Sequence, residues 1–153
     1  LPERLEWLRE AVGEYIEEEM GHQEWILNDI TALGGSAEEV RYGLPSIATE
    51  LMVSYAWDTI QRVNPIGFFG MVLVLEGTSV QLATQAAEAI QKSTGLPNEA
   101  FSYLTSHGSL DIEHVSFFEK LMNKIDNPQD QEAVIYCARI MYKLYGDIFR
   151  GIK

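Results

Sequence analysis

The chain has 153 residues, a length that suits one domain with a substantial buried core. Its 11 basic and 23 acidic residues give a formal net charge of −12, which argues against a nucleic-acid partner and against an anionic membrane surface. The single cysteine, Cys137, cannot form an internal disulfide, and no signal peptide is recognised. We therefore expect one cytoplasmic domain spanning residues 1–153.

The first part of the chain carries a helical pattern. Apolar residues recur at helical spacing, namely Leu5, Leu8, Val12, Ile16, Met20, Trp25 and Ile26. Pro2 suits a first helical turn. The pattern predicts one helix over residues 2–31, which ends at the glycine pair 34–35. Gly21 lies inside this helix at a cost of about 1 kcal/mol relative to alanine. Because Gly21 precedes His22, we expect it to let another helix approach closely.

The remaining elements are also predicted to be helical. A capping box at residues 36–39 begins a short helix. Prolines or an Asn-Pro pair mark the boundaries of the longer helices. The predicted helices are 36–43, 45–63, 66–92, 97–125 and 128–149. The apolar run 66–75 is too short to span a bilayer and indicates a buried helix. The predicted fold is all-α, a compact bundle of about six helices.

The motif His107-x3-Asp111-x2-His114 lies in the last third of the chain. Each helical residue advances roughly 100°, so offsets of four and seven residues place the three side chains within an arc of roughly 60°. Two imidazoles and one carboxylate are ligand types that a redox-active first-row metal takes, with coordination positions left open. The motif therefore predicts a metal site.

The third and last histidine, His22, follows Glu19 in a Glu-x-x-His pair. Helical bundles use that pair to supply a carboxylate and an imidazole to dinuclear metal sites. Glu18, four residues before His22, is equally within reach, so the early carboxylate is either Glu18 or Glu19. Each histidine has a carboxylate three or four residues away, which favours metal binding over three ordinary hydrogen-bonded histidines.

Glu76 follows the ten-residue apolar run and is the candidate middle ligand. An unpaired ionised carboxylate is expensive to bury in such surroundings, and a metal cation would offset that cost. The alternative, equally weighted, is that the helix emerges into water at Glu76. Glu50 is a weaker candidate of the same kind.

Together these residues resemble the heme-oxygenase-like di-iron oxidases and oxygenases. The resemblance spans roughly residues 15–121 and combines Glu19-x-x-His22, Leu75-Glu76-Gly77 and the His107-x3-Asp111-x2-His114 motif. That superfamily shares an all-helical fold with heme oxygenase, thiaminase II and pyrroloquinoline-quinone synthase. Its members use two irons and O2 for oxidative decarboxylation, desaturation, N-oxygenation and C–C cleavage. Members are generally longer at the amino terminus, so we expect leading helices to be missing here.

The resemblance implies a site with two irons per chain and O2 as co-substrate. The implied metal ligands are Glu19, His22, Glu76, His107, Asp111 and His114. Among them, Glu76 and Asp111 are expected to matter most for the chemistry. The implied substrate is a small organic molecule such as a fatty acid or an amino acid derivative. We expect a pocket lined by residues such as Trp25, Tyr55, Phe69, Phe101 and Tyr103, although each of them taken singly suits the core better than a pocket.

Several alternatives stay open at this point. Zinc or manganese could replace iron, although six N/O ligands overfill one tetrahedral zinc site. A bundle that binds a metal or a small molecule without turnover is the rival class. A thiaminase II-like hydrolase needs a nucleophilic cysteine, and Cys137 has no activating neighbour at helical offsets. The oligomeric state is open between a monomer and a homodimer.

Overall fold

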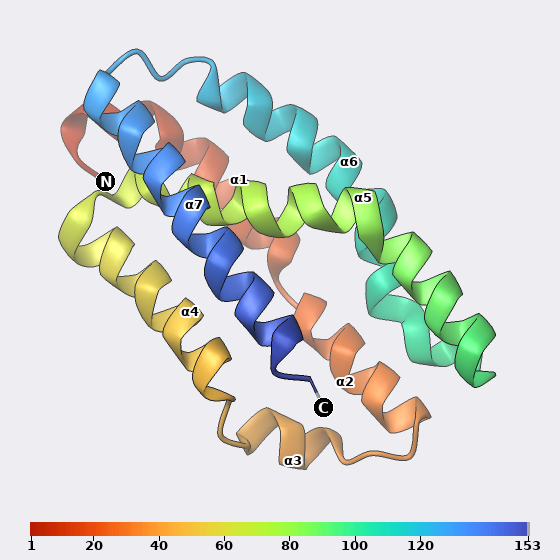
Figure 1. The fold of residues 1–153 in the computed structure, drawn as a ribbon. Helices are drawn as coiled ribbons and strands as arrows, with labels where there is room; N and C mark the ends of the chain where they lie inside the picture. The colour runs from red at the N-terminus through yellow and green to blue at the C-terminus, as the bar shows by residue number, and fades with distance from the viewer. Residues whose placement is uncertain (153) are drawn as a thin grey trace. The chain divides into compact units, whose positions relative to one another are not determined.

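The computed structural model describes residues 1–152, except for the side chains of residues 108–113. Within that range it contains α-helices, short 3-10 and π segments and no strand (Figure 1). The all-α prediction is therefore confirmed. Five of the six predicted helices correspond to single helices or to a helix with its short 3-10 or π extension, and the first does not.

The predicted helix over residues 2–31 is wrong as a single element. A 3-10 segment, Glu3–Leu8, leads into α1 (Arg9–Glu19), and α2 (His22–Ala32) follows after a break. Met20 has extended backbone, and Gly21 has φ 96°, in the left-handed region that favours glycine. A Cβ on Gly21 would meet nothing within 4 Å. Gly21 therefore makes a turn and does not serve the close approach of another helix that we expected.

Side-chain caps set the other predicted boundaries. Ser36 accepts a hydrogen bond from Glu39 N at 3.1 Å and starts α3 (Ala37–Tyr42), as the capping box predicted. Ser46 does the same for α4 (Ile47–Asp58), two residues later than predicted. A π-helical segment, Thr59–Val63, extends α4 to the predicted end.

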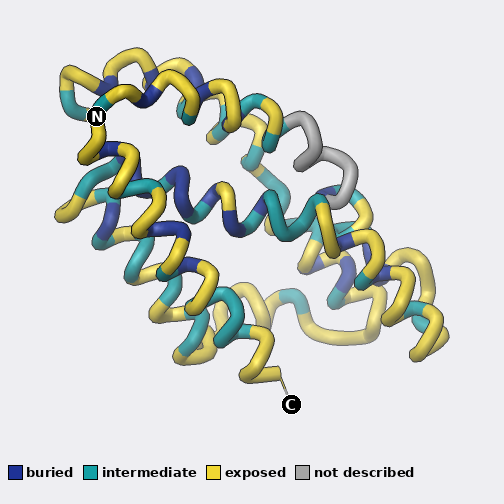
Figure 2. The backbone as a smooth tube through the Cα atoms, turned by 45° about the horizontal axis from the view of Figure 1, so that its top comes forward, coloured by how far each residue is buried: buried dark blue, intermediate teal, exposed yellow. Residues whose placement is uncertain are grey.

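The last three helices follow the predictions closely. After the 3-10 segment Pro65–Gly67 comes α5 (Phe68–Thr94), the longest helix. A third 3-10 segment, Asn98–Phe101, leads into α6 (Ser102–Met122). Asn127 caps α7 (Pro128–Arg150) by accepting hydrogen bonds from two backbone N–H groups. Figure 2 shows buried and exposed positions alternating along α7, as an amphipathic helix requires.

The fold divides into two compact units, each built from two separate stretches of chain. Unit 1 comprises Leu1–Gly43 and Thr78–Ile112, and unit 2 comprises Leu44–Gly77 and Glu113–Lys153. The chain passes from one unit to the other after Gly43, within α5 and within α6. The single-domain organisation predicted from chain length stays a prediction.

In unit 1, α2 packs against α3 and against the 3-10 turn before α6. A small apolar cluster of buried Ala87, Ala100 and Phe101 joins the end of α5 to that turn. Asp29 of α2 is also buried, and its carboxylate accepts hydrogen bonds from the first residues of α6. Polar and apolar contacts thus fix the start of α6 on α2.

In unit 2, α4 and the 3-10 turn before α5 pack against α7. The core consists of Val74, Cys137, Ala138 and Met141. A Cβ at Gly70 would lie 2.6 Å from Ala138 N, so α5 and α7 are in backbone contact at that position. Any larger residue at Gly70 would push the two helices apart.

The segment Pro65–Thr94 is long and apolar enough to cross a membrane by length and composition alone. Core helices of soluble proteins pass the same test. Ile66, Phe69, Val72 and Val74 in this segment are buried in the structure. Their burial agrees with the predicted buried helix.

Candidate metal centre

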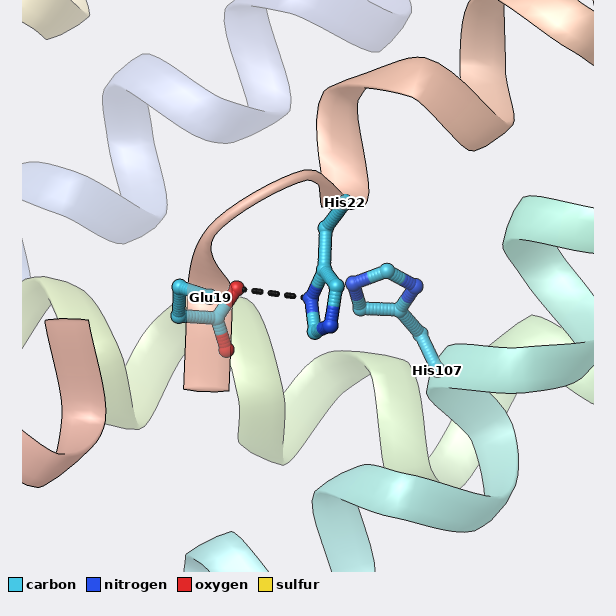
Figure 3. Close-up of side chains that lie close together, drawn as sticks. All are labelled: Glu19, His22 and His107. Carbon is cyan, nitrogen blue, oxygen red and sulfur yellow. Dashed lines mark hydrogen bonds and ion pairs between the residues drawn. The ribbon is translucent and has the colours of Figure 1, made fainter. Parts of the chain in front are cut away.

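The break between α1 and α2 brings Glu19 and His22 together. Glu19 is the last residue of α1 and His22 is the first residue of α2. Glu19 Oε2 lies 3.0 Å from His22 Nδ1, as drawn in Figure 3. The sequence predicted this pairing from helical spacing. The contact forms instead across the turn at Gly21, so the expected pair is present but helical spacing is not its cause.

His107 approaches the same pair from the second turn of α6. It is buried, and its ring centroid lies 5.1 Å from that of His22 at an interplanar angle of 83° (Figure 3). His107 Nδ1 lies 3.0 Å from the carbonyl oxygen of Tyr103. A carbonyl only accepts, so Nδ1 carries the proton and Nε2 keeps the lone pair that a metal needs.

Glu19, His22 and His107 form a group with one ligand atom from each within 4.8 Å of the others. Ligand atoms bound to one metal at about 2.0–2.2 Å lie at most roughly 4.4 Å apart. The three side chains therefore lie close enough together to share one metal after small adjustments. A carboxylate with two imidazoles also has the donor chemistry of a non-heme iron site. The donor set fits the predicted metal.

Two aromatic rings enclose the imidazoles. Trp25 stacks on His22 with centroids 4.2 Å apart and an interplanar angle of 21°. Tyr103 lies over His107 at 4.1 Å and 34°. Trp25 also meets the edge of His107 at 5.5 Å. Both were among the predicted pocket residues, and here their rings restrict how the two imidazoles can turn.

The other predicted pocket residues lie elsewhere. Phe101 is buried in the apolar cluster of unit 1. Tyr55 packs on the core of unit 2, and Phe69 is buried beside Phe118, 5.6 Å away between centroids. These three aromatic residues are core residues in the structure.

In unit 2, Glu76 and His114 form a second carboxylate–imidazole pair. Glu76 Oε2 lies 3.7 Å from His114 Nδ1, and the two side chains are only 7% and 13% exposed. The alternative that α5 emerges into water at Glu76 is therefore excluded. Glu50, the weaker candidate, is exposed on α4 and accepts a hydrogen bond from Ser54.

The remaining predicted ligands have different outcomes. α6 is helical through the whole His107-x3-Asp111-x2-His114 motif, as predicted. The side chain of Asp111 lies outside the described residues, so its role stays a prediction. Glu18 is exposed whereas Glu19 bonds to His22, which favours Glu19 as the early carboxylate.

Sequence reasoning missed one residue next to this group. Asp29 binds the backbone N–H groups of Ser102 and Tyr103, which are 73 and 74 residues away in the chain. No local pattern could have indicated that contact. The only sequence signal is an aspartate two helical turns after a candidate metal ligand.

The thiol of Cys137 has none of the features of a nucleophile. It is buried in the core of unit 2, and burial raises its pKa above the ordinary value. The neighbouring hydroxyl groups of Thr59 and Tyr55 oppose that rise only in part. A buried thiol with a raised pKa is inert at neutral pH.

The model of a protein family described as iron-containing redox enzyme matches residues 1–146. The match includes every predicted metal ligand. No curated protein and no solved structure matches the chain significantly. The comparisons therefore indicate a family and point to no particular substrate.

Proposed function

The chain belongs to the iron-containing redox enzymes of the heme-oxygenase-like superfamily, and we propose that it is a non-heme di-iron oxidase or oxygenase that uses O2 on a small organic substrate. The family match confirms the resemblance inferred from the motifs. The observation that carries the finer proposal is the convergence of Glu19, His22 and His107 within ligand distance.

The donor set favours a bare iron over a heme. Porphyrin supplies four nitrogens to its iron and leaves only axial positions for protein ligands. In unit 1 a carboxylate and two imidazoles converge, which is the ligand set of an iron held by protein side chains alone. A thiaminase II-like hydrolase is disfavoured because Cys137 is buried with a raised pKa.

Two irons per chain follow from the number of ligands. Glu76 and His114 are a second buried carboxylate–imidazole pair. Asp111 is the sixth predicted ligand. Three carboxylates and three imidazoles match two ferrous ions with coordination positions left for O2 and substrate.

Iron, when bound, would supply the electrons for O2 chemistry. The protein's own residues hold the candidate metal ligands in place and orient them. The Glu19 carboxylate offsets cationic charge, and its hydrogen bond with Nδ1 directs the His22 ring. The Tyr103 carbonyl keeps the His107 proton on Nδ1. Trp25 and Tyr103 cover the imidazoles and limit the access of water.

An anaerobic titration with ferrous iron, followed by measurement of O2 uptake, tests this function. We expect saturation near two irons per chain. Exposure to air should then produce O2 uptake that a fatty acid or amino acid derivative stimulates. Saturation at one iron would contradict the di-iron proposal. Two irons without any O2 uptake would favour the rival reading, a metal-binding bundle without turnover.

A further inference from the structure

The start of α6 is fastened to α2 by one buried carboxylate. Asp29 Oδ1 accepts hydrogen bonds from the backbone N–H of Ser102, at 3.0 Å, and from its hydroxyl group. Asp29 Oδ2 accepts from the backbone N–H of Tyr103 at 2.9 Å. Asp29 is only 8% exposed. The two oxygens together satisfy three donors, two of them at the open amino end of a helix.

Tyr103 links this carboxylate to the imidazole of His107. Its N–H bonds to Asp29, and its carbonyl accepts from His107 Nδ1 at 3.0 Å. Its ring also lies 4.1 Å from the His107 ring. The position of Tyr103 therefore decides both where the His107 ring lies and which ring nitrogen carries the proton.

Asp29 is also tied to His22 through α2. The two residues are seven positions apart, which is about two turns and roughly 10 Å along the axis on one side of the helix. His107 follows Tyr103 by four residues, about one turn of α6. Because both helices are stiff over these lengths, the contact between Asp29 and Tyr103 fixes how far apart His22 and His107 lie.

We propose that Asp29 is a positioning residue of the metal centre, which acts through Tyr103 to hold His107 beside His22 with Nε2 ready for a metal. The proposal rests on the proposed function. A simple helix cap could be an exposed, neutral side chain. Burial of a carboxylate costs free energy unless its oxygens accept hydrogen bonds. Asp29 is buried, and both of its oxygens accept hydrogen bonds from the start of α6.

Asp29→Asn tests the positioning role of Asp29 most directly. An amide has one acceptor oxygen, so in the wild-type geometry its NH2 group would face either the Ser102 donors or the Tyr103 N–H. The matched control is Asp130→Asn. Asp130 is a more deeply buried carboxylate that accepts from Asn64 Nδ2 at 2.7 Å in unit 2. Both variants lose a buried charge, and only one of them touches the link to His107.

The first measurement uses metal-free protein at pH 8 and reads the imidazole tautomers from 1H–15N correlation spectra. We expect His107 to be protonated on Nδ1 in the wild type and in Asp130→Asn. In Asp29→Asn we expect a mixture with the Nε2-protonated form. An unchanged Nδ1 tautomer in Asp29→Asn would overturn the proposal, whatever the metal binding of the protein.

The second measurement is a titration with Co(II) followed by its visible absorption bands. Loss of an outer-shell partner typically costs 10- to 100-fold in metal affinity. We expect Asp29→Asn to bind Co(II) at least about 10-fold more weakly, with shifted bands, and Asp130→Asn to stay within about 2-fold of the wild type. Equal losses in both variants would show that Asp29 is only structural. A wild type that binds no Co(II) would instead refute the proposed function.

Wild-type protein provides a test if Asp29→Asn does not fold. Coupling is reciprocal, so if the bond from Tyr103 favours metal binding, then metal must strengthen that bond. Co(II) should slow amide hydrogen exchange at Ser102 and Tyr103 by about 10-fold, the same factor as the expected change in affinity. The amides of Gln129 and Asp130, capped by Asn127 in unit 2, should slow by a clearly smaller factor. Equal effects at both caps would overturn the proposal.

Discussion

At the scale of single residues, the candidate ligands are defined by their partners as much as by their positions. His22 Nδ1 bonds to a carboxylate and His107 Nδ1 bonds to a backbone carbonyl. Such bonds fix the tautomer and the orientation of a metal-binding imidazole. Sequence spacing selected the histidines, but Tyr103 as a partner of His107 became evident only from the structure.

Replacing Glu76 by glutamine tests the chemistry at one residue. The amide keeps the shape but removes a charge, so a bound iron pair would be one unit more positive and less able to reach its oxidised state. We expect Glu76→Gln to fold normally, to keep at least one iron per chain and to lose O2-dependent turnover. Iron analysis and O2 uptake measure these outcomes.

The control for this variant is Glu88→Gln, an exposed carboxylate further along α5. It should behave as the wild type in both measurements. If Glu76→Gln retained full O2 uptake, Glu76 would not be a ligand that matters for the chemistry.

Cys137 gives the protein a pH dependence with a definite sign. Burial raises the pKa of this thiol in the folded protein above the ordinary value of 9.0. The thiol therefore loses its proton at a lower pH in the unfolded chain than in the folded protein. The contribution of the thiol to the free energy of unfolding is complete below about pH 9 and is lost as pH rises through the folded pKa. Burial raises the pKa values of Tyr55 and Tyr145 as well, so they add to the loss at higher pH.

We expect the free energy of unfolding in urea to fall above about pH 9. Cys137→Ala should lower stability at pH 7 because it leaves a small cavity, and should show a shallower fall between pH 9 and 10. Native Cys137 should also react with thiol reagents at pH 8 only after unfolding. Rapid modification of the native protein would contradict its burial.

At the scale of helices, side-chain caps explain why most boundaries were predictable. Ser36, Ser46 and Asn127 each accept backbone N–H groups close to the predicted start of a helix. The break after α1 was missed because apolar periodicity continues across it, and periodicity carries no information on the sign of φ. The apolar pattern treats Gly21 as a glycine within a helix, whereas its positive φ produces the turn that joins Glu19 to His22.

Gly21→Ala tests the role of that turn. A left-handed backbone costs a non-glycine residue about 1–2 kcal/mol, with no other obstacle because the space around Gly21 is open. We expect a loss of that size in unfolding free energy, together with a weaker affinity for ferrous iron, because relief of the strain separates Glu19 from His22. Chemical denaturation and anaerobic titration measure the two effects.

Gly34→Ala is the matched control for the turn. Gly34 also has a positive φ, 80°, and a Cβ there would also meet nothing within 4 Å. It follows the other end of α2, so the variant should lose similar stability and keep its iron affinity. Equal loss of affinity in both variants would mean that the turn at Gly21 has no special part in binding.

At the scale of the whole molecule, the sequence was sufficient for the fold class and the family, and insufficient for the assembly of the centre. Composition and periodicity predicted an all-α chain, and the motifs pointed to the family that matches residues 1–146. The contacts of Asp29 with Ser102 and Tyr103 cross more than 70 residues. Spacing rules describe neighbours on one helix, so they cannot predict such contacts between helices.

Metal binding should stabilise the entire folded chain. A ligand at 100 times its Kd adds about 2.7 kcal/mol to the unfolding free energy, and each kcal/mol raises the Tm of a protein of this size by roughly 2–4 °C. We therefore expect ferrous iron at that concentration to raise the Tm by about 5–11 °C in anaerobic scanning calorimetry, and a chelator to reverse the rise.

The net charge of −12 supplies a competing explanation, because any divalent cation screens an acidic surface. Mg²⁺ at the same concentration separates the two effects, since it is a hard cation that prefers oxygen ligands and retains its waters. Screening would raise the Tm equally with either ion. Binding through His22 and His107 requires nitrogen ligands, so ferrous iron should stabilise the chain far more than Mg²⁺ does, and His107→Ala should remove most of that difference.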